Sequence, residues 1–385
     1  MQEQNHNVLN DKIGIGVDLG STSIAVCCLN MVTKDEICSF SFSNPQCQYG
    51  ADVITRIRHC IDDNPMLDKL GNLVWEQLFS ELNEHLGVGA KHISYIVISG
   101  NTTMQHIVRG LPVDGLAMAP FQPIDLEYRE ESILMNENEI TIIYPPGFSA
   151  FVGADIMTGA QSLNLGQNES YDLLVDLGTN GELLLINSQH GFAASTACGP
   201  VFDHVLAGAS YGSDSIHAIA NCIKRGLIDS TGKIANPFFE KGIEIDKHFV
   251  IKQQNVRNFQ LAKGAIYAGI QCLLKLAGIT YDDISTVYVS GGLGFYMDIK
   301  DAFSVRMLPK EFSGKVVVTE NTSLNGAANL IKGINQGNIL TPKNIDSIKN
   351  EAVLAYYMAA RQRTDSYELA NLPDFQNLYM NALDF

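Results

Sequence analysis

Residues 13–29 read IGIGVDLGSTSIAVCCL, and residues 172–186 read DLLVDLGTNGELLLI. Each segment has an apolar strand, the pattern Val-Asp-Leu-Gly followed by Ser or Thr, and a second apolar strand. Both segments are therefore predicted to form β-hairpins with the same turn chemistry. Their aspartates, Asp18 and Asp176, are a domain length apart. Similarity at this separation predicts two domains built on one plan.

The segments between and after the hairpins mix strand and helix patterns, which predicts an α/β fold. Apolar residues recur at helical spacing in five segments, which are 51–61, 73–86, 151–163, 203–222 and 258–277. Strand patterns recur at 93–98, 286–290 and 315–319. A glycine-rich turn, Gly291-Gly292-Leu293-Gly294, follows the strand pattern at 286–290.

The 385 residues suit two domains better than one core. We expect a first lobe at 1–163, with a Pro- and Gly-rich, loop-rich insertion at about 101–150. A second lobe is expected at 164–325. Residues 326–385 are expected to form C-terminal helices that pack back on the first lobe.

Composition excludes several classes of protein. Apolar residues make up 46% of the chain and charged residues 18%, so the chain can form a sizeable core. The net charge of −16 argues against nucleic-acid binding, which requires a basic surface. The polar leader and the lack of a long apolar run predict a cytoplasmic protein without a membrane segment. The eight cysteines form no CxxC pair, so we expect no iron–sulfur cluster in this chain.

The two hairpin turns have the residues that a phosphate site needs. Glycine permits a tight turn and close approach of a phosphate, and successive N–H groups with a hydroxyl then face the anion. Asp18 and Asp176 are expected to hold Mg²⁺ through its waters. Two such turns facing each other would clamp a triphosphate. The expected phosphate contacts are Gly20, Ser21, Thr22 and Ser23 in one turn, and Gly178, Thr179, Asn180 and Gly181 in the other.

Asn101 and Thr102 follow a strand and open a helix. A helix N-terminus attracts anions, so these two residues are candidates for contact with the γ-phosphate. Asn and Thr are also common helix caps, and plain capping is the favoured alternative.

With these turns, the sequence resembles the superfamily of sugar kinases, seventy-kilodalton heat-shock chaperones and actin. The resemblance implies an actin-like, ribonuclease H-like ATPase fold with ATP or ADP between two related lobes. It also implies that Gly291, Gly292 and Gly294 form an adenosine loop, and that Gln260 and Lys263 flank the nucleoside. Asp155 falls on the segment that resembles the interdomain connecting helix. There it would orient or deprotonate the attacking water, making it a catalytic candidate beside Asp18 and Asp176; a helix cap or ion pair is the alternative.

Longer strings narrow the resemblance. They include NPQ with YGADVI (44–54), GNTTM (100–104), GFSAFVGAD (147–155), QLAKGAI (260–266) and NTSLNGA (321–327). Together they are similar to the C-terminal ATPase region of the reductive activators of corrinoid proteins. That resemblance implies ATP-driven return of a Co(II) corrinoid to Co(I). The implied partner is a corrinoid protein or corrinoid-dependent methyltransferase, and the activator is expected to be a homodimer.

The sequence departs from this family in the source of the electron that reduces the corrinoid. Typical members begin with a [2Fe–2S] ferredoxin domain, and this sequence lacks the C-x₄-C-x₂-C spacing of such a domain. The chain is a fragment, or a separate protein donates the electron, or this member uses ATP differently. Met1 and the polar leader favour a whole protein.

Three alternatives stay open. Activators of 2-hydroxyacyl-CoA dehydratases share an iron–sulfur cluster between subunits, and Cys198 falls near the position of one ligand, although a buried structural thiol is favoured there. A small-molecule kinase would use the same loops, with Asp155 as base. A non-catalytic nucleotide sensor or assembly protein would bind ATP without turnover.

Overall fold

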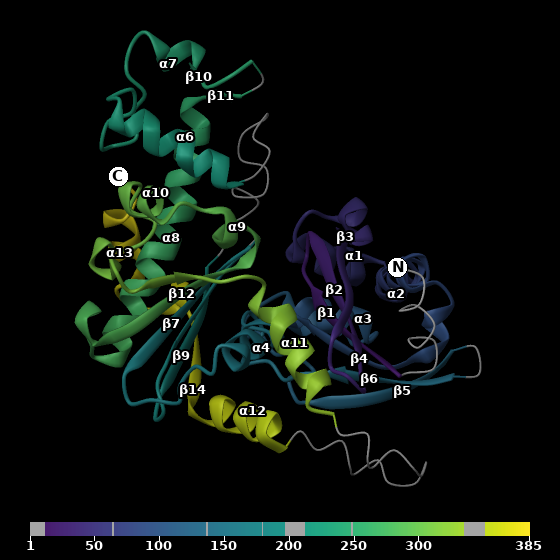
Figure 1. Cartoon of the computed structure of the whole chain (residues 1–385). Helices are drawn as coiled ribbons and strands as arrows, with labels where there is room; N and C mark the ends of the chain where they lie inside the picture. The colour runs from purple at the N-terminus through teal and green to yellow at the C-terminus, as the bar shows by residue number, and fades with distance from the viewer. Residues whose placement is uncertain are drawn as a thin grey trace. The chain divides into compact units, whose positions relative to one another are not determined.

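The structure is a computed structural model (Figure 1), and it describes residues 12–63, 65–135, 138–178, 180–196, 212–247, 249–334 and 351–385. The chain forms two compact units. The first consists of Met1–Asn164 with Thr322–Gln362, and the second of Leu165–Asn321 with Arg363–Phe385. Within the described residues, no helix is both long and apolar enough to cross a membrane.

A mixed six-stranded sheet forms the centre of the first unit, in the order β3-β2-β1-β4-β6-β5. The central strand β1 is antiparallel to β2 and parallel to β4, so the first predicted hairpin is present. The strands are β1 (Ile13–Leu19), β2 (Ser23–Asn30), β3 (Glu36–Ser43), β4 (Ile93–Gly100), β5 (Arg129–Met135) and β6 (Asn138–Tyr144).

The sheet of the second unit repeats this plan, in the order β13-β12-β7-β8-β9-β14. Here β7 is antiparallel to β8 and parallel to β12, as β1 is to β2 and β4. The strands are β7 (Tyr171–Leu177), β8 (Gly181–Ile186), β9 (Gly191–Thr196), β12 (Ile284–Ser290), β13 (Val316–Val318) and β14 (Thr364–Glu368). The two hairpins of the sequence therefore occupy equivalent places in two sheets that share five strands in the same order. The sixth strand differs, since β5 pairs with β6 at one edge of the first sheet and β14 pairs with β9 at the opposite edge of the second.

Helices cover the sheets. Those of the first unit are α1 (Val53–Asp62), α2 (Pro65–Leu86), α3 (Thr102–Val108), α4 (Ala154–Ser162), α11 (Thr322–Lys332) and α12 (Glu351–Arg363), which ends at the boundary between the units. Those of the second unit are α6 (Gly212–Lys224), α7 (Phe238–Lys241), α8 (Gln253–Ala277), α9 (Gly291–Tyr296), α10 (Ile299–Ser304) and α13 (Phe375–Asn381), beside a two-stranded sheet of β10 (Ile243–Glu244) and β11 (Val250–Ile251).

The two faces of β1 differ in chemistry because successive side chains point to opposite sides. Ile13, Ile15 and Val17 pack in one core cluster with Val74 and Leu78 of α2. The other face carries Gly14, Gly16 and Asp18 and is covered by α11 (Figure 1). A strand buried on both faces reads as a nearly continuous apolar run, as residues 13–19 do.

The expected loop-rich insertion at about 101–150 contains more regular structure than its Pro and Gly content indicated, although loops still make up about half of it. It contains α3 and the antiparallel strands β5 and β6, and β6 also pairs in parallel with β4. The alternation of residues 138–144 (NEITIIY) buries Ile140 and Ile142, so this segment completes the sheet. Among the described residues of this segment, 109–128 and 145–150 lack a strand or α-helix, apart from a 3₁₀ turn at Asp114–Leu116.

The tail is divided between the units, in contrast to the expectation that residues 326–385 pack together on the first lobe. Residues 322–362 belong to the first unit, whereas 363–385 belong to the second. The cause is strand pairing, since β14 adds in parallel to β9 and α13 packs on α8. Residues 335–350, where part of the predicted tail helix falls, lie outside the described residues.

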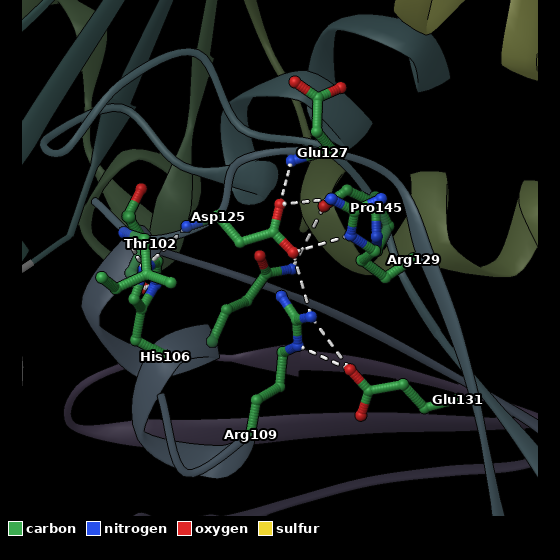
Figure 2. Close-up of polar contacts among 10 residues, drawn as sticks. Thr102, His106, Arg109, Asp125, Glu127, Arg129, Glu131 and Pro145 are labelled. Atoms are coloured by element: carbon green, nitrogen blue, oxygen red, sulfur yellow. Dashed lines mark hydrogen bonds and ion pairs between the residues drawn. The ribbon is translucent and has the colours of Figure 1, made fainter. Parts of the chain in front are cut away.

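A polar cluster fastens the loop 109–128 to α3 (Figure 2). The Nδ1 of His106 lies 2.7 Å from the Thr102 carbonyl oxygen, and its Nε2 accepts from the backbone N–H groups of Ile124 and Asp125. Since Nδ1 must donate to the carbonyl and Nε2 must accept, the imidazole is neutral. The Arg109 guanidinium forms ion pairs with Asp125 of the same loop and with Glu131 of β5.

This arrangement makes stability depend on pH. Burial lowers the pKa of His106 below its ordinary 6.5, and nearby Arg109 lowers it further, against the opposing effect of the Thr102 carbonyl. A lowered pKa means that the unfolded chain binds the proton more readily than the folded chain. The contribution of His106 to stability is therefore complete above about pH 6.5 and is lost as the pH falls below this value.

We expect the free energy of unfolding, measured with urea, to decrease between pH 7.5 and pH 5.5. His106→Gln should make this decrease smaller because it removes the titrating group. His85→Gln is the matched control, since His85 is a surface residue with 39% of its side chain exposed. An unchanged pH dependence in His106→Gln would contradict this assignment.

Candidate functional site

The first acidic–glycine turn connects β1 to β2. Asp18 is the penultimate residue of β1, and Gly20, Ser21 and Thr22 separate the two strands, with Ser23 opening β2. The Asp18 carboxylate accepts a hydrogen bond from the Ser323 hydroxyl at 2.7 Å. The turn and its aspartate therefore lie at the carboxyl end of the central strand.

The backbone carbonyls of this turn are held from one side. Asn44 donates through its side-chain amide to the Gly20 carbonyl and through its backbone N–H to the Thr22 carbonyl, both at 2.8 Å. The Arg56 guanidinium donates to the carbonyl between them, that of Ser21. Because C=O and the following N–H of a trans peptide point in opposite directions, the N–H groups of residues 21–23 are directed to the other side of the turn. Successive N–H groups on one side of a turn are the element from which proteins build anion-binding concavities.

Arg56 is a buried cation beneath this turn. Its side chain is fully buried and also donates to the Gly50 carbonyl and to the Gln46 side-chain oxygen. These acceptors are neutral, and no carboxylate of the described residues lies within ion-pair distance of the guanidinium. Burial lowers the pKa of Arg56, but a guanidinium stays charged in proteins. The turn is therefore supported by a positive charge as well as by hydrogen bonds.

The second turn, in the other unit, has the same position after β7. Asp176 is the penultimate residue of the strand, and the N–H of Gly178 donates to the Asn180 carbonyl at 3.0 Å. Gly181 opens β8, and its carbonyl accepts from the Thr196 hydroxyl. The remaining expected residue, Thr179, lies outside the described residues.

A second repeated feature lies beside both turns and was not expected from the sequence. Each neighbouring parallel strand ends in Ser-Gly, which is Ser99-Gly100 in β4 and Ser290-Gly291 at the end of β12. Ser99 is the register partner of Asp18, and Ser290 is the register partner of Asp176. The signal in the sequence is the pair of segments IVISG and VYVSG.

The glycines of these pairs are required by close packing. A Cβ on Gly100 would lie 2.7 Å from the Leu19 carbonyl oxygen, and one on Gly291 would lie 2.4 Å from the Leu177 carbonyl oxygen. Gly291 also has φ +85, a conformation that favours glycine. Of the other expected adenosine-loop residues, Gly294 packs against Val289 and Gly292 faces open space.

Two expected adenosine contacts are used elsewhere. Gln260 donates to the carbonyls of Thr231 and Leu383, and the Lys263 ammonium donates to those of Ala382 and Asp384. Both side chains are buried. Burial and the nearby charge of Arg306 lower the pKa of Lys263 to about 7. These donors hold the segment 382–384 in place, and the expectation that Gln260 and Lys263 flank the nucleoside stays a prediction.

Asn101 is the N-cap of α3, the alternative favoured for it, and Thr102 is the first residue of this helix. The Asn101 side chain accepts from the N–H of Met104 at 2.9 Å and caps α3. The Thr102 hydroxyl donates to the Ser149 carbonyl at 2.6 Å, and the side chain is 2% exposed. A contact of Thr102 with phosphate would need this bond to open. Asp155 lies in the first turn of α4, where its carboxylate accepts from the N–H of Ile156.

Helix α11 places Ser323 over Asp18. A Cβ on Gly14 would meet Ile331, and one on Gly16 would lie 3.5 Å from the carbonyl carbon of Ala327. Two residues of strand advance about 6.6 Å and four residues of helix about 6 Å, so helix and strand stay in step. The next matched position brings Ser323 to Asp18, where the hydrogen bond is observed. Helix α4 lies beside α11 because Gly326 lets the two backbones approach (Figure 1).

Comparisons with known proteins agree with this topology. A family model described as the RACo middle region matches residues 13–168. A second, described as the C-terminal domain of RACo, the ASKHA domain, matches residues 203–385. The chain belongs to the RACo family. Its fold is accordingly the actin-like ATPase fold, as the repeated hairpins predicted.

Two curated proteins are similar to this RACo-family chain. The "corrinoid activation enzyme RamQ" of Eubacterium limosum is 27% identical, and the match covers 77% of this chain and 60% of the relative. The "[Co(II) methylated amine-specific corrinoid protein] reductase" of Methanosarcina barkeri is 25% identical, with 63% of this chain and 51% of the relative covered. The chain thus spans little more than half the length of these relatives.

A solved structure has the same fold. The "reductive activator for corrinoid, iron-sulfur protein" superposes with a TM-score of 0.82 at 24% sequence identity. The superposition covers 97% of this chain and 66% of that one.

Gly326→Ala tests the contact between α11 and α4. The new Cβ would lie 2.1 Å from the Thr158 carbonyl oxygen, so one of the helices must shift. We expect the free energy of unfolding to fall by about 1–3 kcal/mol. Asn325→Ala on the exposed face of the same helix should change it little. Equal effects of the two substitutions in urea unfolding would contradict the close contact.

Asn44→Ala tests the support of the first turn. It removes the donor to the Gly20 carbonyl and the acceptor for the Gln46 N–H. We expect a loss of about 1–3 kcal/mol in the free energy of unfolding, because the buried N–H of Gln46 and the half-buried carbonyl of Gly20 both lose their partners. Amide hydrogen exchange at residues 21–23 should become faster. Gln48→Ala is the control, since Gln48 is exposed and bonds only the Pro45 carbonyl; faster exchange in this control as well would argue against a specific role for Asn44.

Proposed function

We propose that this protein is an ATP-dependent reductive activator of a corrinoid protein, and that it hydrolyses ATP in the cytoplasm to help return Co(II) corrinoid to Co(I). The observation that carries the proposal is the pair of acidic–glycine turns, each beside a Ser-Gly strand end, in a RACo-family chain. The names of the two curated relatives supply the corrinoid partner.

Phosphate binding by the first turn is supported by three features of the same few residues. The N–H groups of residues 21–23 are directed away from Asn44 and Arg56, the Ser21 and Thr22 hydroxyls belong to the turn, and Gly20 has no side chain. The buried charge of Arg56 adds a favourable electrostatic term for an anion, since it acts in a medium of low dielectric constant. In the other unit, Gly178, Thr179, Asn180 and Gly181 are proposed to bind phosphate in the same way.

Asp18 and Asp176 are the residues that we propose hold Mg²⁺ through its waters. The oxygen chemistry of carboxylates suits this ion, and both side chains are partly exposed at the ends of their strands. Bound Mg²⁺ would neutralise part of the negative charge of the phosphates.

Asp155 is proposed to orient the attacking water, a role that its position in the first turn of α4 permits. Asn101 stays a candidate for the γ-phosphate, beside the N-terminal turn of α3.

The reaction combines two balanced changes. ATP and water give ADP and phosphate, and Co(II) gains one electron to become Co(I). We propose that a separate low-potential donor supplies that electron and that the nucleotide state biases the activator between two conformations.

The adenosine of the nucleotide is proposed to contact Gly291, Gly292 and Gly294. The activator is proposed to act as a homodimer.

The direct test begins with calorimetry. Purified protein should bind ATP in the presence of Mg²⁺, and turnover should rise when a Co(II) corrinoid protein and a reductant are added. Appearance of the Co(I) absorption spectrum with ATP, and its absence with ADP, would support the proposal. Nucleotide retained without turnover would indicate a sensor, and a phosphorylated small molecule would indicate a kinase. Failure to bind nucleotide would overturn the proposal.

Asp176→Asn should weaken Mg²⁺-dependent ATP hydrolysis without unfolding the protein. The amide keeps the shape but loses the charge that holds the hydrated ion, so we expect the Mg²⁺ concentration for half-maximal rate to rise about 10–100-fold. Asp172→Asn is the matched control, because Asp172 lies on the same face of β7 two strand repeats farther from the turn. Unfolding of Asp176→Asn in thermal denaturation would instead assign Asp176 a structural role.

A further inference from the structure

A series of buried hydroxyls leads from Asp18 into the first unit. The Ser323 hydroxyl donates to the Asp18 carboxylate at 2.7 Å and lies 3.0 Å from the Ser99 hydroxyl. Ser99 lies 2.7 Å from the Thr158 hydroxyl, which donates to the Ala154 carbonyl at 2.9 Å. The three residues are at most 4% exposed. Four contacts in series therefore join the carboxylate to the first turn of α4.

The number of protons in this series limits which of its contacts can be hydrogen bonds. Three hydroxyls carry three protons, and the series contains four contacts. The two end contacts use the protons of Ser323 and Thr158, because an ionised carboxylate and a carbonyl can only accept. Ser99 can then donate to one neighbour but not to both, so one contact lacks a proton while Asp18 is ionised.

The ionised carboxylate therefore fixes the direction of the hydrogen bond at its end of the series, because Ser323 must donate to it. A cation at Asp18 favours the ionised carboxylate, and the Ser323 hydroxyl then points its proton at it. A hydrogen bond to the charged form also lowers the energy of that form.

We propose that Ser323 is a positioning residue that orients Asp18 for hydrated Mg²⁺, and that Ser99 and Thr158 connect this carboxylate to helix α4. The proposal rests on the proposed function, because it assigns Asp18 to the metal of bound ATP. The Thr158 hydroxyl also lies 3.2 Å from the Asp155 carbonyl oxygen. The series thus ends at the turn that carries the residue proposed to orient water.

The hydroxyls could not take this arrangement without the close packing around them. Asp18 and Ser99 are register partners on neighbouring parallel strands and so point to the same face. Gly326, one turn after Ser323, brings α11 against Thr158 of α4. Two strands and two helices thus converge on one line of oxygens.

The test compares Ser323→Ala with Asn325→Ala, which alters the exposed face of the same helix. Loss of one hydrogen bond to a charged group should raise the Mg²⁺ concentration for half-saturation of the ATP complex about tenfold. Binding of ATP in EDTA should change less than twofold, since only the metal-dependent step needs Asp18. Asn325→Ala should match the wild type in both measurements.

A second pair of variants keeps the test decisive if Ser323→Ala fails to fold. Thr158→Val removes the hydroxyl at nearly constant shape and should also raise the Mg²⁺ concentration needed for half-saturation. Thr158→Ser keeps the hydroxyl and should need the same Mg²⁺ concentration as the wild type. A Mg²⁺ requirement in folded Ser323→Ala or Thr158→Val equal to that of wild type would overturn the role of the hydroxyl series alone. A wild-type protein that binds no MgATP would overturn both the proposed function and the role of the hydroxyl series.

Discussion

The first unit depends on how closely α11 approaches the central strand β1. Gly14 and Gly16 leave no side chains on the strand, and Gly326 leaves none on the helix where it meets α4. Larger residues at these positions would separate the layers by about the width of a methyl group. The hydrogen bond between Ser323 and Asp18 spans only 2.7 Å and would not survive such a separation. Close packing of backbones is therefore what fixes the acidic residue of the turn.

The two units use one arrangement with different details. Each has an antiparallel hairpin with an aspartate before the turn, and each has a parallel neighbour that ends in Ser-Gly. The glycine packs on the carbonyl of the leucine that follows the aspartate in both units. Ser99 joins the hydroxyl series, whereas the Ser290 hydroxyl lies 3.4 Å from the Glu320 carbonyl oxygen. The shared backbone plan thus supports distinct side-chain chemistry at equivalent positions.

Electrostatics and hydrogen bonding act together at the first turn. Arg56 and Asn44 hold three successive carbonyls, and the same peptide geometry turns the following N–H groups toward the opposite side. The loop 109–128 is fastened by His106 and Arg109 to α3, the helix that Asn101 caps. Segments that lack regular structure are therefore fixed by buried polar groups, both charged and neutral.

The sequence by itself determined the α/β class, the two hairpins and their equivalence, because strand alternation and turn chemistry are local properties. It also indicated the RACo-like family through short strings that include Asn44 and Ser323, but it could not assign these residues a role. The partners of Asp18, the support of the turn by Arg56, and the use of Gln260 and Lys263 by the C-terminal segment were decided only by the tertiary structure. These contacts join residues 35 to more than 300 positions apart, and no local pattern specifies which distant side chain a buried polar group will meet.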